Sequence, residues 1–192
     1  MKVIGLAGRA GSGKSAVARW LAQRSGIEWV DLDRLAWETY APGTATYERL
    51  IEAFGDDIVA PSGQIDRAQL SQRAFADDAS LETLNRIVHP AVSEAVKEVV
   101  RRHRLQGTEL LLLEGALIAS SPHVDRSTYD VVVWLEVPSG VRADRLRLSG
   151  RPDHAQRGEV VSPQPQVRTV SGEGTIEQVG ERLLAAVSGS DA

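Results

Sequence analysis

The segment with the clearest chemical signature is a glycine-rich stretch near the amino terminus. Residues 8–15 match the pattern G-x-x-x-x-G-K-[ST] and end in Gly13, Lys14 and Ser15. The glycines of this pattern let consecutive backbone N–H groups face a phosphate, and the helix that follows adds the partial positive charge of its N-terminus. The pattern predicts that Lys14 reaches the β- and γ-phosphates of a nucleotide and that the Ser15 hydroxyl binds Mg²⁺. An unrelated glycine-rich turn is the alternative, and it fits less well with a strand before the loop and a helix after it.

A pair of aspartates follows the next apolar run of the chain. Asp31 and Asp33 come after residues 27–30, which we expect to form a short strand. On an extended backbone, residues two apart point to the same side. One carboxylate could then accept the proton of an attacking hydroxyl while the other orients Mg²⁺ through water, because phosphoryl transfer depends mainly on positioning and charge neutralisation. Asp33 also precedes a helical segment, so a helix N-cap is an alternative that is compatible with catalysis.

The elements that position these residues follow from hydrophobic periodicity. Short apolar runs predict buried strands at residues 3–7, 27–30, 110–113 and 131–135, with a weaker strand at 166–170. Helical spacing predicts a helix after the loop, a helix-only stretch at 47–105 and an amphipathic closing helix at 176–187. Strands that alternate with helices indicate an α/β fold, with a parallel five-stranded sheet in a three-layer core and a helical insertion.

Ligands of such sheets bind at the carboxyl ends of the strands. Besides the loop and the aspartates, this rule selects Glu114 and Glu136. Glu114 could be structural, or it could lie near Mg²⁺ and an acceptor. The tryptophans are expected in the core, with lining of the acceptor pocket as the alternative for Trp37.

Composition restricts the remaining chemistry. The chain has 192 residues, of which 42% are hydrophobic and 25% charged, as expected for one soluble domain. Because it has no cysteine, disulfides, thiolate catalysis and Cys-ligated metals are excluded. A net charge of −4 argues against nonspecific nucleic-acid binding. No signal peptide or membrane-spanning segment is recognisable, so we expect a cytoplasmic protein that binds neither membranes nor nucleic acid.

On these residues the chain resembles the dephospho-coenzyme A kinases, which are P-loop kinases of the nucleoside-monophosphate-kinase type. The similarity runs in register over residues 2 to about 148. The elements that carry it are the phosphate loop, the aspartate pair within 30–36, Pro42-Gly43, Phe54-Gly55, the segment 63–67 with Leu70 and Phe75, His89-Pro90, the segment 112–114, and Arg145-Leu146.

The resemblance implies ATP- and Mg²⁺-dependent phosphorylation of the 3′-hydroxyl of dephospho-CoA to give coenzyme A. It assigns the general base to Asp33 and places substrate contacts in the helical insertion. The residues expected to bind ATP are Gly11, Ser12, Gly13, Lys14, Ser15 and Ala16. Those expected to bind Mg²⁺ are Ser15 and Asp31, and those expected to contact the acceptor are Asp33, Arg67, His89 and Glu114. Taken alone, Arg67 could be an exposed helix residue, and His89 before Pro90 could be a polar helix start.

The chain departs from the family after Arg145. The family has a helical lid with arginines that close on the phosphates, whereas residues 147–158 are rich in helix breakers. Phosphate closure therefore falls to Arg145, which we expect to stabilise developing charge, or to Arg147, Arg151 or Arg157. A kinase for another small hydroxylated or nucleotide substrate, and a nucleotide-binding regulatory protein with little turnover, are the alternative functions.

We expect one kinase domain over residues 1–192. Its nucleotide-binding core would comprise 1–36 and 107–192, with a helical CoA-binding insertion at 37–106 and a shortened lid at 147–163.

Overall fold

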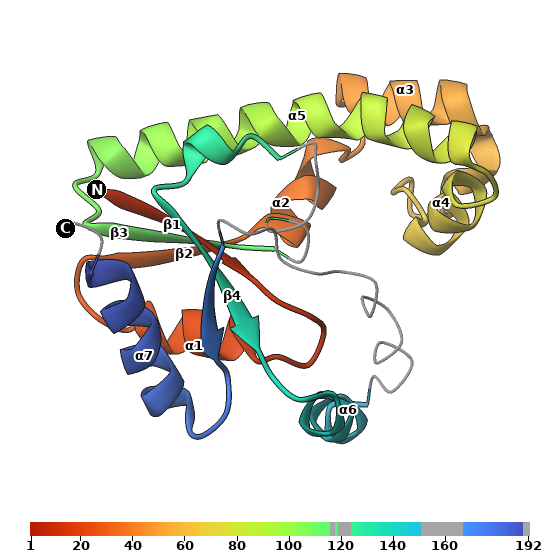
Figure 1. Cartoon of the computed structure of the whole chain (residues 1–192). Coiled ribbons are helices and arrows are strands. Elements are labelled where there is room, and N and C mark those ends of the chain that lie inside the picture. Colours follow the sequence, from red (N-terminus) through yellow and green to blue (C-terminus); the bar gives the residue numbers. More distant parts are fainter. Residues whose placement is uncertain (116–117, 119–123, 151–166, 190–192) are drawn as a thin grey trace. The chain divides into compact units, whose positions relative to one another are not determined.

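A computed structural model of the chain describes residues 1–115, 118, 124–150 and 167–189 (Figure 1). The chain divides into two compact units. The first comprises Met1–Leu32 and Val100–Ala192, and the second comprises Asp33–Val99. Within the described residues, no helix combines the length and the apolar character that crossing a membrane requires.

The first unit is built on a five-stranded sheet in which every pair of neighbouring strands is parallel, so the predicted sheet is confirmed. Its strands in chain order are β1 (Lys2–Ala7), β2 (Ile27–Asp31), β3 (Leu110–Glu114), β4 (Val131–Glu136) and β5 (Arg168–Ser171). Their order across the sheet is β2-β3-β1-β4-β5. Glu114 at the end of β3 is in register with Leu6 of β1 and with Asp31 of β2. The carboxyl ends of these three strands therefore meet at one edge, where the phosphate loop leaves β1.

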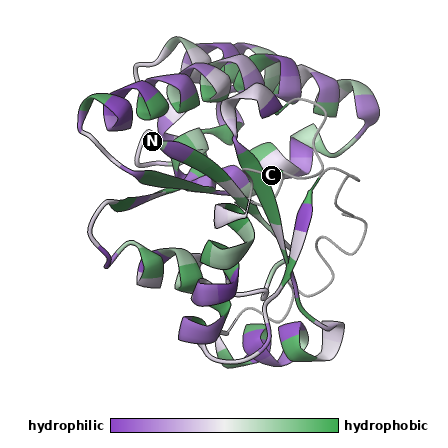
Figure 2. Cartoon of the chain, turned by 60° about the vertical axis from the view of Figure 1, so that its left-hand side comes forward, coloured by the Kyte–Doolittle hydropathy of each residue, from purple (hydrophilic) through white to green (hydrophobic). Residues whose placement is uncertain are grey.

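One face of this sheet is covered by α1 (Lys14–Leu21) and α7 (Ile176–Ser188), which lie side by side in Figure 1. Most of the strand length is green, the hydrophobic colour, in Figure 2, while the helices mix green and purple along their length. α7 begins at a capping box in which Thr175 and Gln178 bond each other's backbone N–H groups. The buried side chains of this face include Ile4, Leu6, Val17, Leu21, Leu112, Leu135, Val179 and Leu183.

The opposite face is packed closely around Gly5. A Cβ atom at Gly5 would lie 2.9 Å from both Ile118 and Tyr129, so a larger residue does not fit beneath these side chains. Burial, and secondarily the charge of Asp125, raises the pKa of Tyr129 to about 12, so its phenol is neutral.

The second unit is helical and has its own core. Its helices are α2 (Leu32–Thr39), whose first residue belongs to the first unit, α3 (Ala45–Phe54), the 3₁₀ turn η1 (Asp56–Ile58), α4 (Arg67–Ala74) and most of α5 (Asp78–Leu105). The buried core residues are Leu50, Phe54, Ile58, Ile65, Leu70, Ala74 and Ile87. The helix-only stretch predicted from periodicity is confirmed.

The helix start considered at His89 is wrong, because α5 continues through Pro90 as one 28-residue helix. A proline inside a helix removes one hydrogen bond and costs about 3 kcal/mol. Residues on both sides of it are buried, including Ile87 and Val96. The packing of α5 on both sides of Pro90 offsets this local energetic penalty. Hydrophobic periodicity alone does not predict that outcome.

The contact between α1 and α7 depends on a glycine. A Cβ atom at Gly180 of α7 would lie 2.3 Å from the ring of Trp20 on α1, and Arg24 covers that ring with its guanidinium 4.3 Å from the centroid. We therefore expect Gly180→Ala to lower the free energy of unfolding by about 1–3 kcal/mol, although alanine is the better helix former.

Gly140 of α6 (Ser139–Leu148) is a matched control, because a Cβ atom there would meet nothing within 4 Å. Gly140→Ala should leave stability unchanged or raise it slightly. Urea denaturation followed by circular dichroism measures both variants. Equal midpoints for the two would contradict the proposed close approach of the helices.

Candidate active site

The glycine-rich loop lies between β1 and α1, in the strand–loop–helix context that the sequence indicates. Gly13 precedes α1 with φ 95°, a left-handed conformation that side chains disfavour. At Gly11 a Cβ atom would lie 2.7 Å from the carbonyl oxygen of Arg142 on α6. The loop therefore needs glycine for two separate reasons, namely backbone conformation at Gly13 and close packing at Gly11.

Lys14, the first residue of α1, folds back over the loop. Its Nζ donates hydrogen bonds to the carbonyl oxygens of Gly8 at 2.8 Å and Arg9 at 3.2 Å. The ammonium group is thus held at the loop by the backbone itself, where it can balance the charge of a bound phosphate.

Ser15 links the loop to the acidic edge of the sheet. Its hydroxyl donates to Glu114 Oε1 at 3.0 Å, and Glu114 is buried. Asp31 is in register with Glu114 on the neighbouring strand. A hydroxyl and two carboxylates form an oxygen-only donor set, which suits Mg²⁺. No cluster of three or more acidic, histidine or cysteine side chains occurs among the described residues, so a Mg²⁺ ion bound here would take its further ligands from phosphate and water.

Arg145 of α6 joins the loop to the segment after β5. Its two terminal nitrogens donate to the carbonyl oxygens of Ser12 and Gly172, each at 3.1 Å. One turn earlier, the buried Arg142 donates to Ala10 at 3.3 Å. Two arginines of one helix therefore hold the backbone of the loop.

Beside the loop lies a cavity of about 200 Å³ with a mostly apolar lining. Arg145 and the loop backbone form one wall, and Val17 of α1 with Ile176 and Val179 of α7 form another. The complete lining is Ser12, Gly13, Ala16, Val17, Arg145, Gly172, Gly174, Ile176 and Val179. The family resemblance places Ser171 and Gly172 near the adenine, but sequence reasoning did not find the contribution of Gly174, Ile176 and Val179 to this lining. Ile176 and Val179 read only as the buried face of the closing helix.

The position of Asp33 differs from the sequence-based expectation. β2 ends at Asp31 and α2 begins at Leu32, so Asp33 lies in the first turn of a helix. The argument from an extended backbone is therefore wrong for this pair, and so is the N-cap, because Asp33 is inside the helix. Asp33 is exposed and belongs to the second unit, whereas Asp31 belongs to the first.

The second unit contains a cavity of about 300 Å³ formed by α2, the turn after it and the start of α4. The guanidinium carbon of Arg67 lies 3.7 Å from the ring centroid of Trp37. Trp37 is 46% exposed, so its expected place in the core is wrong, whereas Trp134 is fully buried as predicted. The lining residues are Arg34, Trp37, Glu38, Tyr40, Ala41, Pro42, Gln64, Ile65 and Arg67.

A tight turn and a helix cap place Arg67. Residues Val59 and Ile65 pair across the turn, and the Tyr47 hydroxyl donates to the carbonyl of Gly63 at 2.7 Å. Asp66 then caps α4 by accepting from the backbone of Ala68 and Gln69, a bond type that contributes about 1 kcal/mol. Arg67 is therefore the first residue of a helix whose start is fixed.

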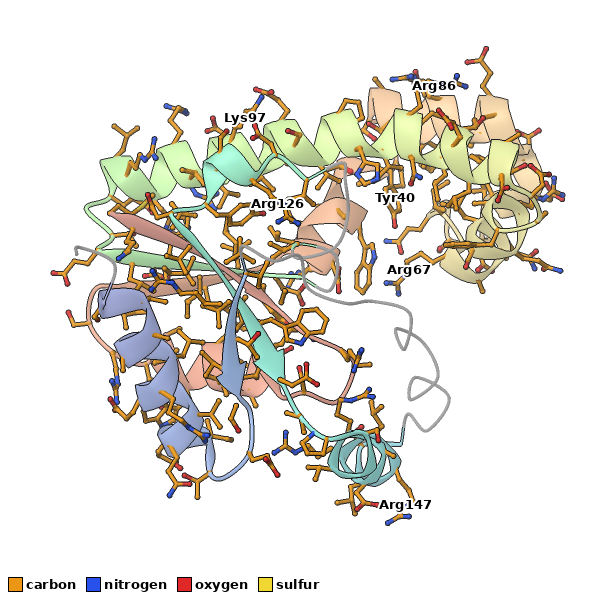
Figure 3. The ribbon with its side chains drawn as sticks, viewed as in Figure 1. Tyr40, Arg67, Arg86, Lys97, Arg126 and Arg147 are labelled. Atoms are coloured by element: carbon orange, nitrogen blue, oxygen red, sulfur yellow. The ribbon has the colours of Figure 1, made fainter. Side chains whose placement is uncertain are left out.

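Figure 3 shows Arg67 and Tyr40 on the same side of α5, with Arg86 extending from its opposite side. Burial raises the pKa of Tyr40, and the charge of Arg67 partly opposes this shift. The cavity thus presents neutral aromatic surface beside a fixed cation.

Two other expected site residues take different places. His89 is half-buried inside α5 and does not line the described cavity. Arg147 is exposed at the end of α6, where it pairs with Asp144 at 3.0 Å and points outward (Figure 3). Arg151, Arg157 and most of the expected lid lie outside the described residues.

Comparison with known proteins identifies relatives over most of the chain. The sequence model of the dephospho-CoA kinase family matches residues 2–155. The dephospho-CoA kinase of Thermobifida fusca is 35% identical over 161 residues, which is 83% of this chain and 78% of the relative. That of Geobacter sulfurreducens is 31% identical and covers 95% of both chains.

Solved structures agree in fold. The protein TT1252 from Thermus thermophilus superposes with a TM-score of 0.79 and 27% identity, covering 100% of this chain and 98% of its own. A dephospho-CoA kinase from Campylobacter jejuni reaches a TM-score of 0.62 at 13% identity, covering 98% of this chain and 96% of its own, which supports the fold alone. With the family match and the curated relatives, the predicted resemblance is confirmed: this chain belongs to the dephospho-CoA kinase family.

Proposed function

We propose that this chain transfers the γ-phosphate of ATP to the 3′-hydroxyl of dephospho-CoA, which gives ADP and coenzyme A. The observation that carries the proposal is that this chain, a member of the family, holds both functional side chains of its phosphate loop in place. Lys14 is bonded across the loop, and Ser15 is bonded to a buried carboxylate at the end of a strand. Both are side chains that a kinase needs at the transferring phosphate.

The loop binds the phosphates through its backbone N–H groups and the N-terminus of α1. Lys14 would exchange its bonds to Gly8 and Arg9 for bonds to phosphate oxygens when a nucleotide binds. Such an exchange costs little reorganisation, since the ammonium group is already positioned.

Mg²⁺ would be held by the Ser15 hydroxyl, with Asp31 and Glu114 oriented toward it directly or through water. When bound, the ion supplies positive charge that neutralises the β- and γ-phosphates. The chain's own contribution is the acidic edge formed by β2 and β3, where Asp31 and Glu114 are neighbours in register.

The cavity beside the loop is the best candidate for the adenine of ATP. Its lining combines apolar side chains with the planar guanidinium of Arg145, which are surfaces against which a flat base can pack. In this arrangement the guanidinium of Arg145 packs against the adenine, in addition to the charge-stabilising role expected from sequence.

Asp33 is the proposed general base. It is an exposed carboxylate in the first turn of α2 and follows the strand end as the family motif requires. The proposed acceptor region is the helical part of the chain, with the cavity around Trp37 and Arg67 as its centre. The division into a core at 1–36 and 107–192, an insertion at 37–106 and a lid at 147–163 is proposed with it.

The first test changes the base. Asp33→Asn removes the proton acceptor but keeps the size of the side chain, so kcat should fall about 10²- to 10⁴-fold while ATP binding is retained. The assay follows 3′-phosphorylation of dephospho-CoA with Mg²⁺ and ATP, and calorimetry measures ATP binding.

Glu48→Gln is the matched control, because it makes the same carboxylate-to-amide change at an exposed position in the first turn of α3. It should behave as wild type. Lys14→Ala should lose both turnover and ATP affinity. Wild-type protein that binds ATP but produces no coenzyme A would refute the proposed function.

The second test separates two roles of Arg145. If its guanidinium is a wall of the base pocket, Arg145→Ala should raise the KM for ATP by about 10-fold or more with a smaller change in kcat. A large loss of kcat at saturating ATP would instead support the stabilisation of developing charge. Arg147→Ala is the control, since Arg147 lies on the same helix but points outward and pairs with Asp144.

A further inference from the structure

Trp37 is an exposed aromatic side chain that the structure holds in place. Its ring is contacted by Arg67 at 3.7 Å, yet the residue remains 46% exposed. An exposed tryptophan loses hydrophobic stabilisation unless something covers it. Because a guanidinium covers at most one face of the ring, the remaining surface of Trp37 is available to a ligand in the 300 Å³ cavity that it lines.

The position of Trp37 along α2 connects it to the proposed base. Asp33 and Trp37 are four residues apart in this helix, so they lie on the same face, with Cβ atoms about 5–6 Å apart. A planar group stacked on Trp37 therefore has its neighbouring atoms within reach of the Asp33 carboxylate. This relation holds within one helix.

We propose that Trp37 is the stacking platform for the adenine of the acceptor, and that it makes phosphorylation depend on this base. The proposal rests on the proposed function. In dephospho-CoA, the hydroxyl that is phosphorylated lies on the same ribose that carries the adenine. Only the ribose ring separates the adenine from the 3′-hydroxyl. When the adenine stacks on Trp37, this hydroxyl can therefore reach Asp33, which lies one helical turn away on the same face of α2.

The charges around the cavity match the rest of the acceptor. Arg67 and Arg34 both line it, with one carboxylate, Glu38, which bonds Arg34 at 3.2 Å. Arg67 is engaged by an aromatic ring rather than by a carboxylate, so its charge is not neutralised. The acceptor carries a diphosphate on the 5′-carbon of the same ribose, and a guanidinium binds phosphate oxygens in pairs. The cavity therefore offers a base platform with a phosphate-binding group beside it.

Arg67 acts in this arrangement as a positioning residue for the ring as well as a cation. Its start-of-helix position is fixed by the Asp66 cap, and the turn before it is tied to α3 through Tyr47. The ring orientation of Trp37 is thus set by elements that do not belong to α2.

The experiment compares dephospho-CoA with an abasic analogue that carries hydrogen in place of adenine. Wild-type protein should prefer dephospho-CoA in kcat/KM by about 10- to 100-fold, the range that base–aromatic stacking provides. Trp37→Leu should lose this preference mainly through the KM of dephospho-CoA, and its rate with the abasic analogue should stay within about twofold of wild type. Trp37→Phe should recover most of the preference, because it restores an aromatic face.

Phe75→Leu is the matched control, since Phe75 is another aromatic residue of this unit and is 67% exposed away from the cavity lining. It should leave the preference unchanged. A loss in Trp37→Leu that is equal for both acceptors would show that Trp37 is only structural and would overturn the proposal, as would a Trp37→Leu variant with unchanged kinetics.

A binding measurement distinguishes failure of this proposal from failure of the proposed function. With the nucleotide site filled by a non-hydrolysable ATP analogue, dephospho-CoA should quench tryptophan fluorescence in wild type but not in Trp37→Phe. Quenching without turnover would refute the proposed reaction and leave the platform supported. Turnover without quenching, and with no base preference, would refute the platform and leave the reaction supported.

Discussion

The nucleotide-binding part of this structure depends on one constraint. The glycine-rich loop has no regular secondary structure, so its neighbours must support it. A curled glycine-rich backbone loses more conformational entropy on ordering than any other segment, so it must be held by its neighbours. Here α6 provides that support. Gly11 packs against the backbone of Arg142, and Arg142 and Arg145 donate to loop carbonyls at Ala10 and Ser12. Both arginines hold the loop through its carbonyl oxygens, so these bonds do not occupy the N–H groups of the loop.

A comparable arrangement occurs in the helical unit, although its chemistry differs. There the fixed point is the start of α4, and the group that it positions is a guanidinium against an indole ring. In both units a cation is held by neutral partners, backbone carbonyls in one and an aromatic face in the other. Neutral partners orient an arginine without cancelling its charge, which an ion pair with a carboxylate would do.

The sequence predicted those features that depend on local pattern. The apolar runs located all five strands, and the spacing of glycines with Lys14 located the loop, because both signals arise from neighbouring residues. Features that depend on contacts between distant segments were missed. The cavity wall at Gly174 and Ile176 requires β5 to lie beside β4, and the continuity of α5 through Pro90 requires packing on both sides of it. Asp33 is a separate case, because its backbone was assigned to a strand that ends two residues earlier, while its role as the base stays a prediction.

The net charge of −4 shows how little a summed charge says about a site of this kind. Charges on a protein surface are screened over about 8–10 Å in physiological salt, so a phosphate responds to the groups at its own position. At the loop these groups are Lys14, Arg145 and the dipole of α1, and the carboxylate of Glu114 is bonded to Ser15. An acidic chain can thus hold a polyanion wherever a few cations are fixed by the backbone. The fixing of those cations, more than their number, determines the affinity, because a guanidinium that is already ordered loses little further entropy when the phosphate binds.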